Sequence, residues 1–224
     1  MGVPRPGPPV VFDCDGVLLE TEPRWTLVET QLFAKYGHPY GHEEKLQLIG
    51  TGLGGTGKQF ETMLDQPGRA AELLSELVEL AAAEFARGVE PMKGALHIVG
   101  ELRDLGRPMA IASNSFHRLV DLALKGSALR DAFDVIVAAD DVDEPKPAPD
   151  LFLEACRRIG ARPDDAVAVE DSPTGVASAR AAGLFVIGIP SMEGLRLEEA
   201  DLVASSLETP EVREALGLPA TSGS

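Results

Sequence analysis

Short apolar runs recur along the chain, and several end on an acidic or amide residue. They are VVFDCDG (10–16), PMAIASN (108–114), VIVAAD (135–140), AVAVED (166–171), LFVIGIP (184–190) and a weaker DLVASS (201–206). Near-continuous runs of Val, Ile and Ala are typical of strands that are buried on both faces of a parallel sheet. The pattern therefore predicts a parallel sheet.

Segments with helical spacing lie between these runs, and each ends on glycine, the usual residue just past a helix terminus. They are GALHIVGELRDLG (94–106), FHRLVDLALKG (116–126), APDLFLEACRRIG (148–160) and TGVASARAAG (174–183). Strands and helices in alternation predict an open α/β sheet with right-handed crossovers, which is a Rossmann-like core.

Residues 20–90 break this alternation. TEPRWTLVETQLFAKYG (21–37) and AAELLSELVELAAAEFARG (70–88) have helical spacing, and no convincing strand lies between them. We therefore predict a helical cap at 20–90, inserted into an α/β core formed by 1–19 and 91–224. The tail LGLPATSGS (216–224) is expected to fray.

The chain is acidic, with 36 Asp and Glu against 20 Lys and Arg and a net charge of −16. Such a surface repels phosphate backbones, so we expect neither nucleic acid nor a membrane as a partner. Cys14 and Cys156 are too few for a metal or disulfide pattern, and residues 1–10 lack the apolar run of a secretory signal. These features predict a cytoplasmic protein, expected to be a monomer or a weak homodimer.

Polar residues stand at the ends of the predicted strands, where open α/β sheets bind ligands. They are Asp13 and Asp15, Ser113 and Asn114, Glu170 and Asp171, joined by Lys146 in the loop DEPKPAPD (143–150). The spacing of two points both aspartates to the same side of an extended strand. Neighbouring carboxylates repel each other, so a site that holds them needs a cation or a shared proton, and oxygen ligands with room for water favour Mg²⁺.

Each of these motifs also has an ordinary structural interpretation. Asp-x-Asp-Gly is a common turn, SNS before a helix can act as an N-cap, and a lysine between two prolines can be solvated. Their shared position at strand ends favours a functional site over these alternatives.

The motifs DCDGV, SNS, KPAPD and EDSPTG, in this order, resemble the four motifs of the haloacid dehalogenase superfamily. The resemblance covers nearly the whole chain, including a cap after the first motif. It is strongest to the phosphatases and mutases related to β-phosphoglucomutase, and DGVLLETEPRW resembles the sugar-phosphate phosphatases of that group.

The resemblance implies a role for each residue. Asp13 would be the nucleophile that becomes an aspartyl phosphate, and Asp15 would protonate the leaving alkoxide and later activate water. The side chains of Asp13 and Asp171 and the Asp15 carbonyl would hold Mg²⁺, with Glu170 assisting through water. Ser113 and the Asn114 backbone would bind phosphoryl oxygens, and Lys146 would offset the charge that spreads over them.

The same resemblance leaves a phosphosugar mutase as an alternative to a phosphatase. The cap His of the mutase falls at Trp25 here, and its Lys and Arg fall near the apolar Ile49 and Leu53. Little is left to hold a second phosphate. We therefore predict an Mg²⁺-dependent phosphatase for a small phosphomonoester, such as a sugar or polyol phosphate.

The stretch GLGGTGKQ (52–59) comes close to a nucleotide-binding loop. That loop needs Ser or Thr after its lysine to coordinate Mg²⁺, and this chain has Gln59. We expect instead a flexible, glycine-rich loop between cap helices, in which Lys58 has no assigned role.

Overall fold

The computed structural model describes residues 7–48, 52–192 and 194–220, and its core is a six-stranded parallel sheet in the order β3-β2-β1-β4-β5-β6. The strands are β1 Val10–Phe12, β2 Met109–Ala112, β3 Val135–Val137, β4 Val167–Glu170, β5 Phe185–Gly188 and β6 Leu202–Val203. Each strand lies within one of the apolar runs, so the predicted Rossmann-like core is confirmed.

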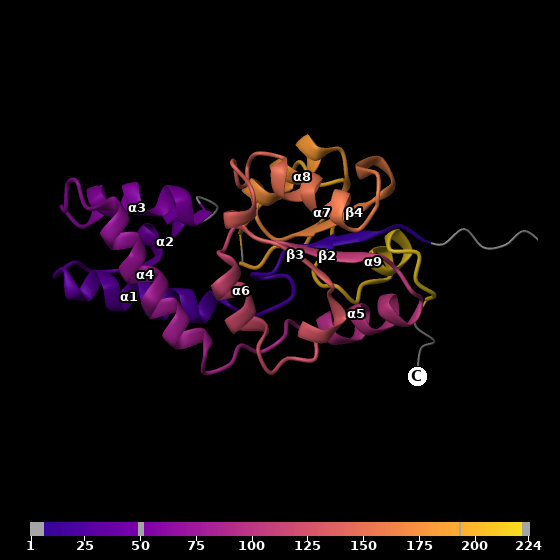
Figure 1. Ribbon diagram of the computed structural model, residues 1–224, viewed down its shortest axis with the longest axis horizontal. Coiled ribbons are helices and arrows are strands. Elements are labelled where there is room, and N and C mark those ends of the chain that lie inside the picture. Colours follow the sequence, from indigo (N-terminus) through magenta and orange to yellow (C-terminus); the bar gives the residue numbers. More distant parts are fainter. Residues whose placement is uncertain (1–6, 49–51, 193, 221–224) are drawn as a thin grey trace, which may run out of the picture.

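Helices cover both faces of the sheet (Figure 1). One face carries α7 and α8, and the other carries α5, α6 and α9. Their bounds are α5 Ala95–Asp104, α6 His117–Leu124, α7 Asp150–Arg158, α8 Pro173–Ala182 and α9 Pro210–Ala215; short 3₁₀ turns cover Arg130–Ala132, Ala139–Asp141 and Pro163–Asp165.

Alternate residues of the central strands enter different apolar cores. Val10 and Phe12 pack on the side of α5 and α6, whereas Val11 packs on the side of α7 and α8. The pleat of a strand sends successive side chains to opposite faces, and here both faces are dry. The sheet interior therefore has no place for unpaired polar side chains, which leaves them at the strand ends.

The segment between β1 and α5 forms a group of helices at one end of the molecule (Figure 1). These helices, α1 Glu22–Lys35, α2 His42–Leu48, α3 Gly52–Met63 and α4 Ala70–Phe85, are the cap. The rings of Phe33 and Phe60 meet edge to face with their centroids 5.7 Å apart, inside the cap. The prediction that the inserted segment is helical is confirmed. The exact domain boundaries at residues 20 and 90 stay a prediction.

The expected loop at residues 52–59 is wrong, because these residues begin helix α3. Helix α3 packs closely on α4: a Cβ at Gly57 would lie 2.6 Å from the backbone oxygen of Ala70. Gly57 is therefore a close-contact glycine between two helices, and tertiary packing outweighs the low helix propensity of glycine. Ile49 and the side chain of Leu53 lie outside the described residues.

The expected fraying of the C-terminal tail is also wrong for its first residues. Leu216 and Leu218 are buried, and the Arg213 guanidinium donates hydrogen bonds to the Pro219 carbonyl through Nε (2.9 Å) and Nη2 (2.6 Å). Helix α9 and these contacts hold residues 216–219 against the core. Residues 221–224 lie outside the described part.

Within the described part of the chain, no helix combines the length and the apolar character that a membrane span requires.

Two glycine-to-alanine substitutions should change stability in opposite directions. Gly57→Ala should destabilise the protein by about 1–3 kcal/mol, because the new methyl group would press on the Ala70 carbonyl. Gly100→Ala, inside α5 with nothing within 4 Å of its Cβ position, should add about 0.5–1 kcal/mol. Urea unfolding measures both, and an equal gain in the two variants would contradict the close α3–α4 contact.

Candidate active site

The register of the sheet brings separate segments of the chain to one edge. Strand β1 lies between β2 and β4, and Phe12 pairs with Ile111 on one side and Val169 on the other. Since all three strands are parallel, the residues that follow them meet at the same carboxyl edge. Asp13 therefore lies between the end of β2 and the end of β4.

Lys146 joins these strand ends. The residue is only 4% exposed. Its ammonium donates hydrogen bonds to Asp13 Oδ1 at 2.6 Å, to Glu170 Oε1 at 2.5 Å and to the Ala112 carbonyl at 2.7 Å. Three acceptors satisfy all the N–H bonds of an ammonium. The interpretation of Lys146 as a solvated loop residue is therefore wrong.

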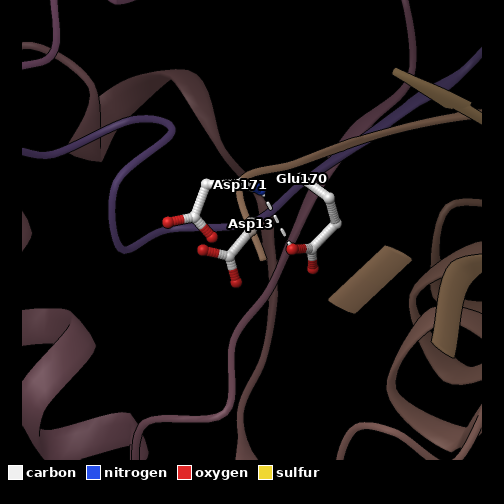
Figure 2. A group of neighbouring side chains, drawn as sticks. All are labelled: Asp13, Glu170 and Asp171. Atoms are coloured by element: carbon white, nitrogen blue, oxygen red, sulfur yellow. Dashed lines mark hydrogen bonds between the residues drawn. The ribbon is translucent and has the colours of Figure 1, made fainter. Parts of the chain in front are cut away.

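The carboxylates of Asp13, Glu170 and Asp171 form an acidic cluster, with one oxygen of each within 4.8 Å of the others (Figure 2). Two glycines make room for it. A Cβ at Gly16, whose φ is +79°, would lie 2.3 Å from Asp171 Oδ2, and a Cβ at Gly175 would lie 1.9 Å from Glu170 Oε2. The glycines of DCDGV and EDSPTG are thus required by the carboxylates beside them.

The electrostatics of this cluster follow from its burial. Burial raises the pKa of Asp13, and the nearby Glu170 and Asp15 raise it further against the opposing effect of Lys146. Burial and the charges of Asp13 and Glu170 likewise raise the pKa of Asp171. Burial alone would lower the pKa of Lys146, but Asp13 and Glu170 raise it above its ordinary value, so we treat this lysine as charged.

Asp15 faces a different set of partners from Asp13. Its Oδ2 accepts hydrogen bonds from Ser113 Oγ at 3.3 Å and Ser115 Oγ at 3.1 Å, and its Oδ1 accepts one from Trp25 Nε1 of the cap at 3.2 Å. Trp25 also packs edge to face on Phe85, with centroids 5.2 Å apart. The Asp15 carboxyl is thus held from the core on one side and from the cap on the other.

Asn114 ties the SNS segment to the loop of Lys146. Its Oδ1 accepts from the Lys146 backbone N–H at 2.8 Å, and its Nδ2 donates to the Lys146 carbonyl at 3.2 Å. This pair of bonds fixes the backbone from which the Lys146 side chain reaches Asp13.

A pocket of about 160 Å³ lies between the cap and the carboxyl edge of the sheet. The core lines it with Asp13, Asp15, Asn114, Ser115, Lys146, Asp171, Ser172, Thr174, Ser191, Met192 and Leu195, and the cap lines it with Glu22, Trp25, Glu29, Lys45, Leu48, Thr56 and Leu77. Its volume is below the few hundred Å³ usual for drug-sized ligands, which points to a small molecule.

Most of the residues that the sequence singled out line this pocket, whereas Ser113 and Glu170 lie fully buried behind it. Sequence reasoning missed Ser115 and Ser191 and named Trp25 only as the position of the cap His of the mutase. The Trp25 ring packs on Phe85 inside the cap and also lines the pocket. Ser115 stands two residues after Ser113, a spacing that offered a signal, but Ser191 is an ordinary loop serine in the sequence.

The acidic cluster suits a divalent cation such as Mg²⁺. Three buried carboxyl groups share one ammonium, and the raised pKa values of Asp13 and Asp171 show that ionising all three is costly without a further cation in this site of oxygen ligands. Asp13 and Asp171 would hold the ion, and Glu170 would support them. The side chain of Asp15 does not belong to the cluster, and its predicted role through the backbone carbonyl stays a prediction.

Comparison with known proteins agrees with this geometry. Residues 10–189 match the haloacid dehalogenase-like hydrolases. The chain belongs to this family. Its fold is also similar to that of a β-phosphoglucomutase from Clostridium difficile, with a TM-score of 0.76 at 19% identity over 94% of this chain and 97% of that chain, which agrees with the predicted resemblance at the level of the fold.

Two relatives and one solved structure illustrate the similarity. The putative phosphatase YhcW of Bacillus subtilis (strain 168) is 34% identical over 185 residues, 81% of this chain and 83% of that protein. The fructose-1-phosphate phosphatase YqaB of Escherichia coli (strain K12) is 30% identical over 180 residues, 80% of this chain and 95% of that protein. The crystal structure of CbbY from Rhodobacter sphaeroides in complex with phosphate has a TM-score of 0.80 at 28% identity, with 93% of this chain and 98% of that chain covered.

This chain spans about half, 48%, of the bifunctional riboflavin kinase/FMN phosphatase of Arabidopsis thaliana, to which it is 31% identical over 184 residues. The family and its phosphatase members confirm the predicted enzyme class, a hydrolase of phosphomonoesters.

The acidic cluster should lower the stability of the metal-free protein. In EDTA at pH 8, Asp171→Asn should be more stable than the wild type by on the order of 1 kcal/mol, because it removes one buried like charge. The pKa of Asp171 is raised in the folded state, so ionisation of this carboxyl lowers the free energy of unfolding. This destabilisation is absent below the unfolded-state pKa of about 4, where the group is protonated in both states, and it grows as the pH rises. The gain should therefore shrink toward pH 4.

Thermal melts at several pH values measure this difference, and the exposed Asp104→Asn is the matched control. With excess Mg²⁺, the wild type should gain stability and Asp171→Asn should not. A destabilised Asp171→Asn protein in EDTA would contradict the electrostatic account.

Proposed function

We propose that this protein is an Mg²⁺-dependent phosphatase that hydrolyses a small phosphomonoester through an aspartyl phosphate on Asp13. The observation that carries the proposal is the position of the Asp13 carboxylate. It lines the pocket, lies within the acidic cluster and accepts a 2.6 Å hydrogen bond from the buried Lys146. A nucleophile, a cationic partner and ligands for a metal therefore share one cavity.

The first displacement uses Asp13 and Asp15. A carboxylate oxygen of Asp13 attacks phosphorus, a P–O bond to Asp13 forms, and the P–O bond to the alcohol breaks. Asp15 gives its proton to the departing alkoxide. The hydrogen bonds from Ser115 and Trp25 hold the Asp15 carboxyl at the mouth of the same pocket.

The second displacement regenerates the enzyme. Water attacks phosphorus and gives a proton to Asp15, the P–O bond to Asp13 breaks, and inorganic phosphate leaves. Lys146 places positive charge beside the phosphoryl oxygens, and the Asn114 backbone and Ser113 are proposed to bind them. When bound, Mg²⁺ supplies charge that offsets the repulsion between Asp13 and the phosphate dianion.

The size and lining of the pocket support a small, polar substrate such as a sugar or polyol phosphate. A pocket of about 160 Å³ has room for such a molecule, and the fructose-1-phosphate and hexitol phosphatases among the relatives act on esters of this kind, as their names state. The proposed location is the cytoplasm, with a monomer or a weak homodimer as the working form.

Substitutions at the two aspartates should have different effects. Asp13→Asn should lower the kcat for p-nitrophenyl phosphate by about a thousandfold or more, since no phosphorylated enzyme can form. Asp15→Asn should lower the kcat for alkyl phosphates more than the kcat for p-nitrophenyl phosphate, because the p-nitrophenolate leaving group is stable without protonation by an acid. Steady-state and burst kinetics on both esters measure this split.

Activity above a few per cent in Asp13→Asn, with the fold checked by circular dichroism, would defeat the nucleophile assignment. Conversion of glucose 1-phosphate to glucose 6-phosphate with a bisphosphate primer, and little release of phosphate, would favour the mutase instead.

Removal of the metal should abolish turnover reversibly. EDTA should reduce hydrolysis of p-nitrophenyl phosphate to background, and added Mg²⁺ should restore it, because the metal-free site confronts the phosphate dianion with uncompensated carboxylates. A colorimetric phosphate assay measures the loss and the recovery. Hydrolysis that continues without any divalent cation would count against the metal site.

A further inference from the structure

A second charged cluster lines the pocket on the side of the cap, away from the aspartates of the core. Lys45 of α2 lies between two carboxylates of α1, with Nζ 2.9 Å from Glu22 Oε2 and 3.1 Å from Glu29 Oε2. Tyr40 donates its hydroxyl proton to the same Glu29 oxygen. We call these four residues the cap cluster.

The central pair of the cap cluster, Glu29 and Lys45, is buried and yet faces the cavity. Glu29 and Lys45 are only 7% and 8% exposed, and Glu22, Glu29 and Lys45 all line the pocket. Burying an ion pair costs desolvation that its own attraction rarely exceeds, so a buried pair is weak evidence for a purely stabilising role. Its position on a pocket wall favours a role toward a ligand.

Helix α1 links this cluster to the catalytic end of the pocket. Glu22, Trp25 and Glu29 are spaced i, i+3 and i+7, which places them on one face of the helix. The middle residue, Trp25, donates to Asp15. A substrate whose ester oxygen lies at Asp15 therefore extends along this face toward the cap cluster.

The charges of the cap cluster can form hydrogen bonds with hydroxyl groups of a ligand and would repel a second phosphate. Two carboxylates surround one ammonium, and the cations among the described lining residues, Lys45 and Lys146, are both paired with carboxylates. A hydroxyl donates to a carboxylate and accepts from an ammonium, so it can use both partners. A phosphate dianion would meet like charge without a free cation.

We propose that the cap cluster is a hydroxyl-binding subsite that selects neutral, polyhydroxylated leaving groups and rejects bisphosphates. This inference rests on the proposed phosphatase function and assigns the part of the substrate beyond the phosphate. It also gives Lys45 a specificity-determining role for which the strand-end motifs provide no signal.

The test compares kcat/KM for esters that differ beyond the phosphate, in Mg²⁺. The substrates are p-nitrophenyl phosphate, fructose 1,6-bisphosphate and three monophosphates, namely fructose 1-phosphate, sorbitol 6-phosphate and glycerol 3-phosphate. For the wild type, the best monophosphate should exceed the bisphosphate by about tenfold or more, since the bisphosphate brings an unpaired charge.

Two variants should change these ratios in different ways. Lys45→Met should lower the ratio of the best monophosphate to p-nitrophenyl phosphate by about 10-fold to 100-fold, because a donor to the hydroxyls is lost. Glu22→Gln should raise the ratio of the bisphosphate to the best monophosphate by about tenfold, because a repelling charge is removed.

Controls separate specificity from folding. Lys35→Met makes the same chemical change in an exposed ion pair of the cap, between Lys35 Nζ and Glu76 Oε2 at 2.7 Å, and should leave both ratios unchanged. Thermal melts show whether Lys45→Met folds, and Lys45→Arg should recover part of the lost ratio. Glu22, which is 33% exposed at its side chain, provides a variant that is easier to accommodate.

The outcomes distinguish the two proposals. If the wild type hydrolyses none of the esters, including p-nitrophenyl phosphate, the proposed function fails and the subsite fails with it. If it hydrolyses p-nitrophenyl phosphate but none of the three monophosphates, or if folded Lys45→Met and Glu22→Gln leave both ratios unchanged, the subsite alone is overturned.

Discussion

The buried ammonium of Lys146 is the interaction on which the arrangement of the site depends. It joins the ends of three neighbouring strands through Asp13, Glu170 and the Ala112 carbonyl, in a place that the apolar faces of the sheet keep dry. One ammonium cannot balance three carboxylates, and burial prevents water from screening the excess charge. The fold therefore holds carboxyl groups whose ionisation is costly without a further cation, as their raised pKa values indicate, and such an arrangement suits a site that binds a cation.

The pocket has two ends with different chemistry. The core end combines carboxylates with Lys146 and suits a charged phosphate and its metal, whereas the cap end offers the paired charges around Lys45. The core residues follow from strands and their register, while the cap residues come from helices that share an apolar cluster with one face of the sheet. The cap residues around Lys45 lie apart from the aspartates of the core, whereas Trp25 ties the cap to Asp15 directly.

Glycine marked the ends of the core helices correctly but was a misleading guide inside the cap. GLGGTGKQ suggested a loop because glycine lowers helix propensity, yet Gly57 lies in α3 where the Ala70 backbone leaves no room for a Cβ. Gly16 and Gly175 also make room, in their case for the carboxylates of Asp171 and Glu170. The local sequence does not show whether a glycine serves a turn or a close contact, because the neighbour that decides the matter comes from a distant segment.

The sequence by itself determined the parallel sheet, its helical crossovers, the inserted cap and the family, because apolar periodicity and ordered motifs are local properties of the chain. It also placed Asp13, Asp15 and Asp171 at strand ends and Lys146 in a loop, and the fold then brought them together. Only the tertiary structure decided that Lys146 is buried, that Trp25 reaches Asp15 and that Lys45 lies between Glu22 and Glu29. These contacts join residues of different elements, and their geometry depends on how helices and strands pack in three dimensions.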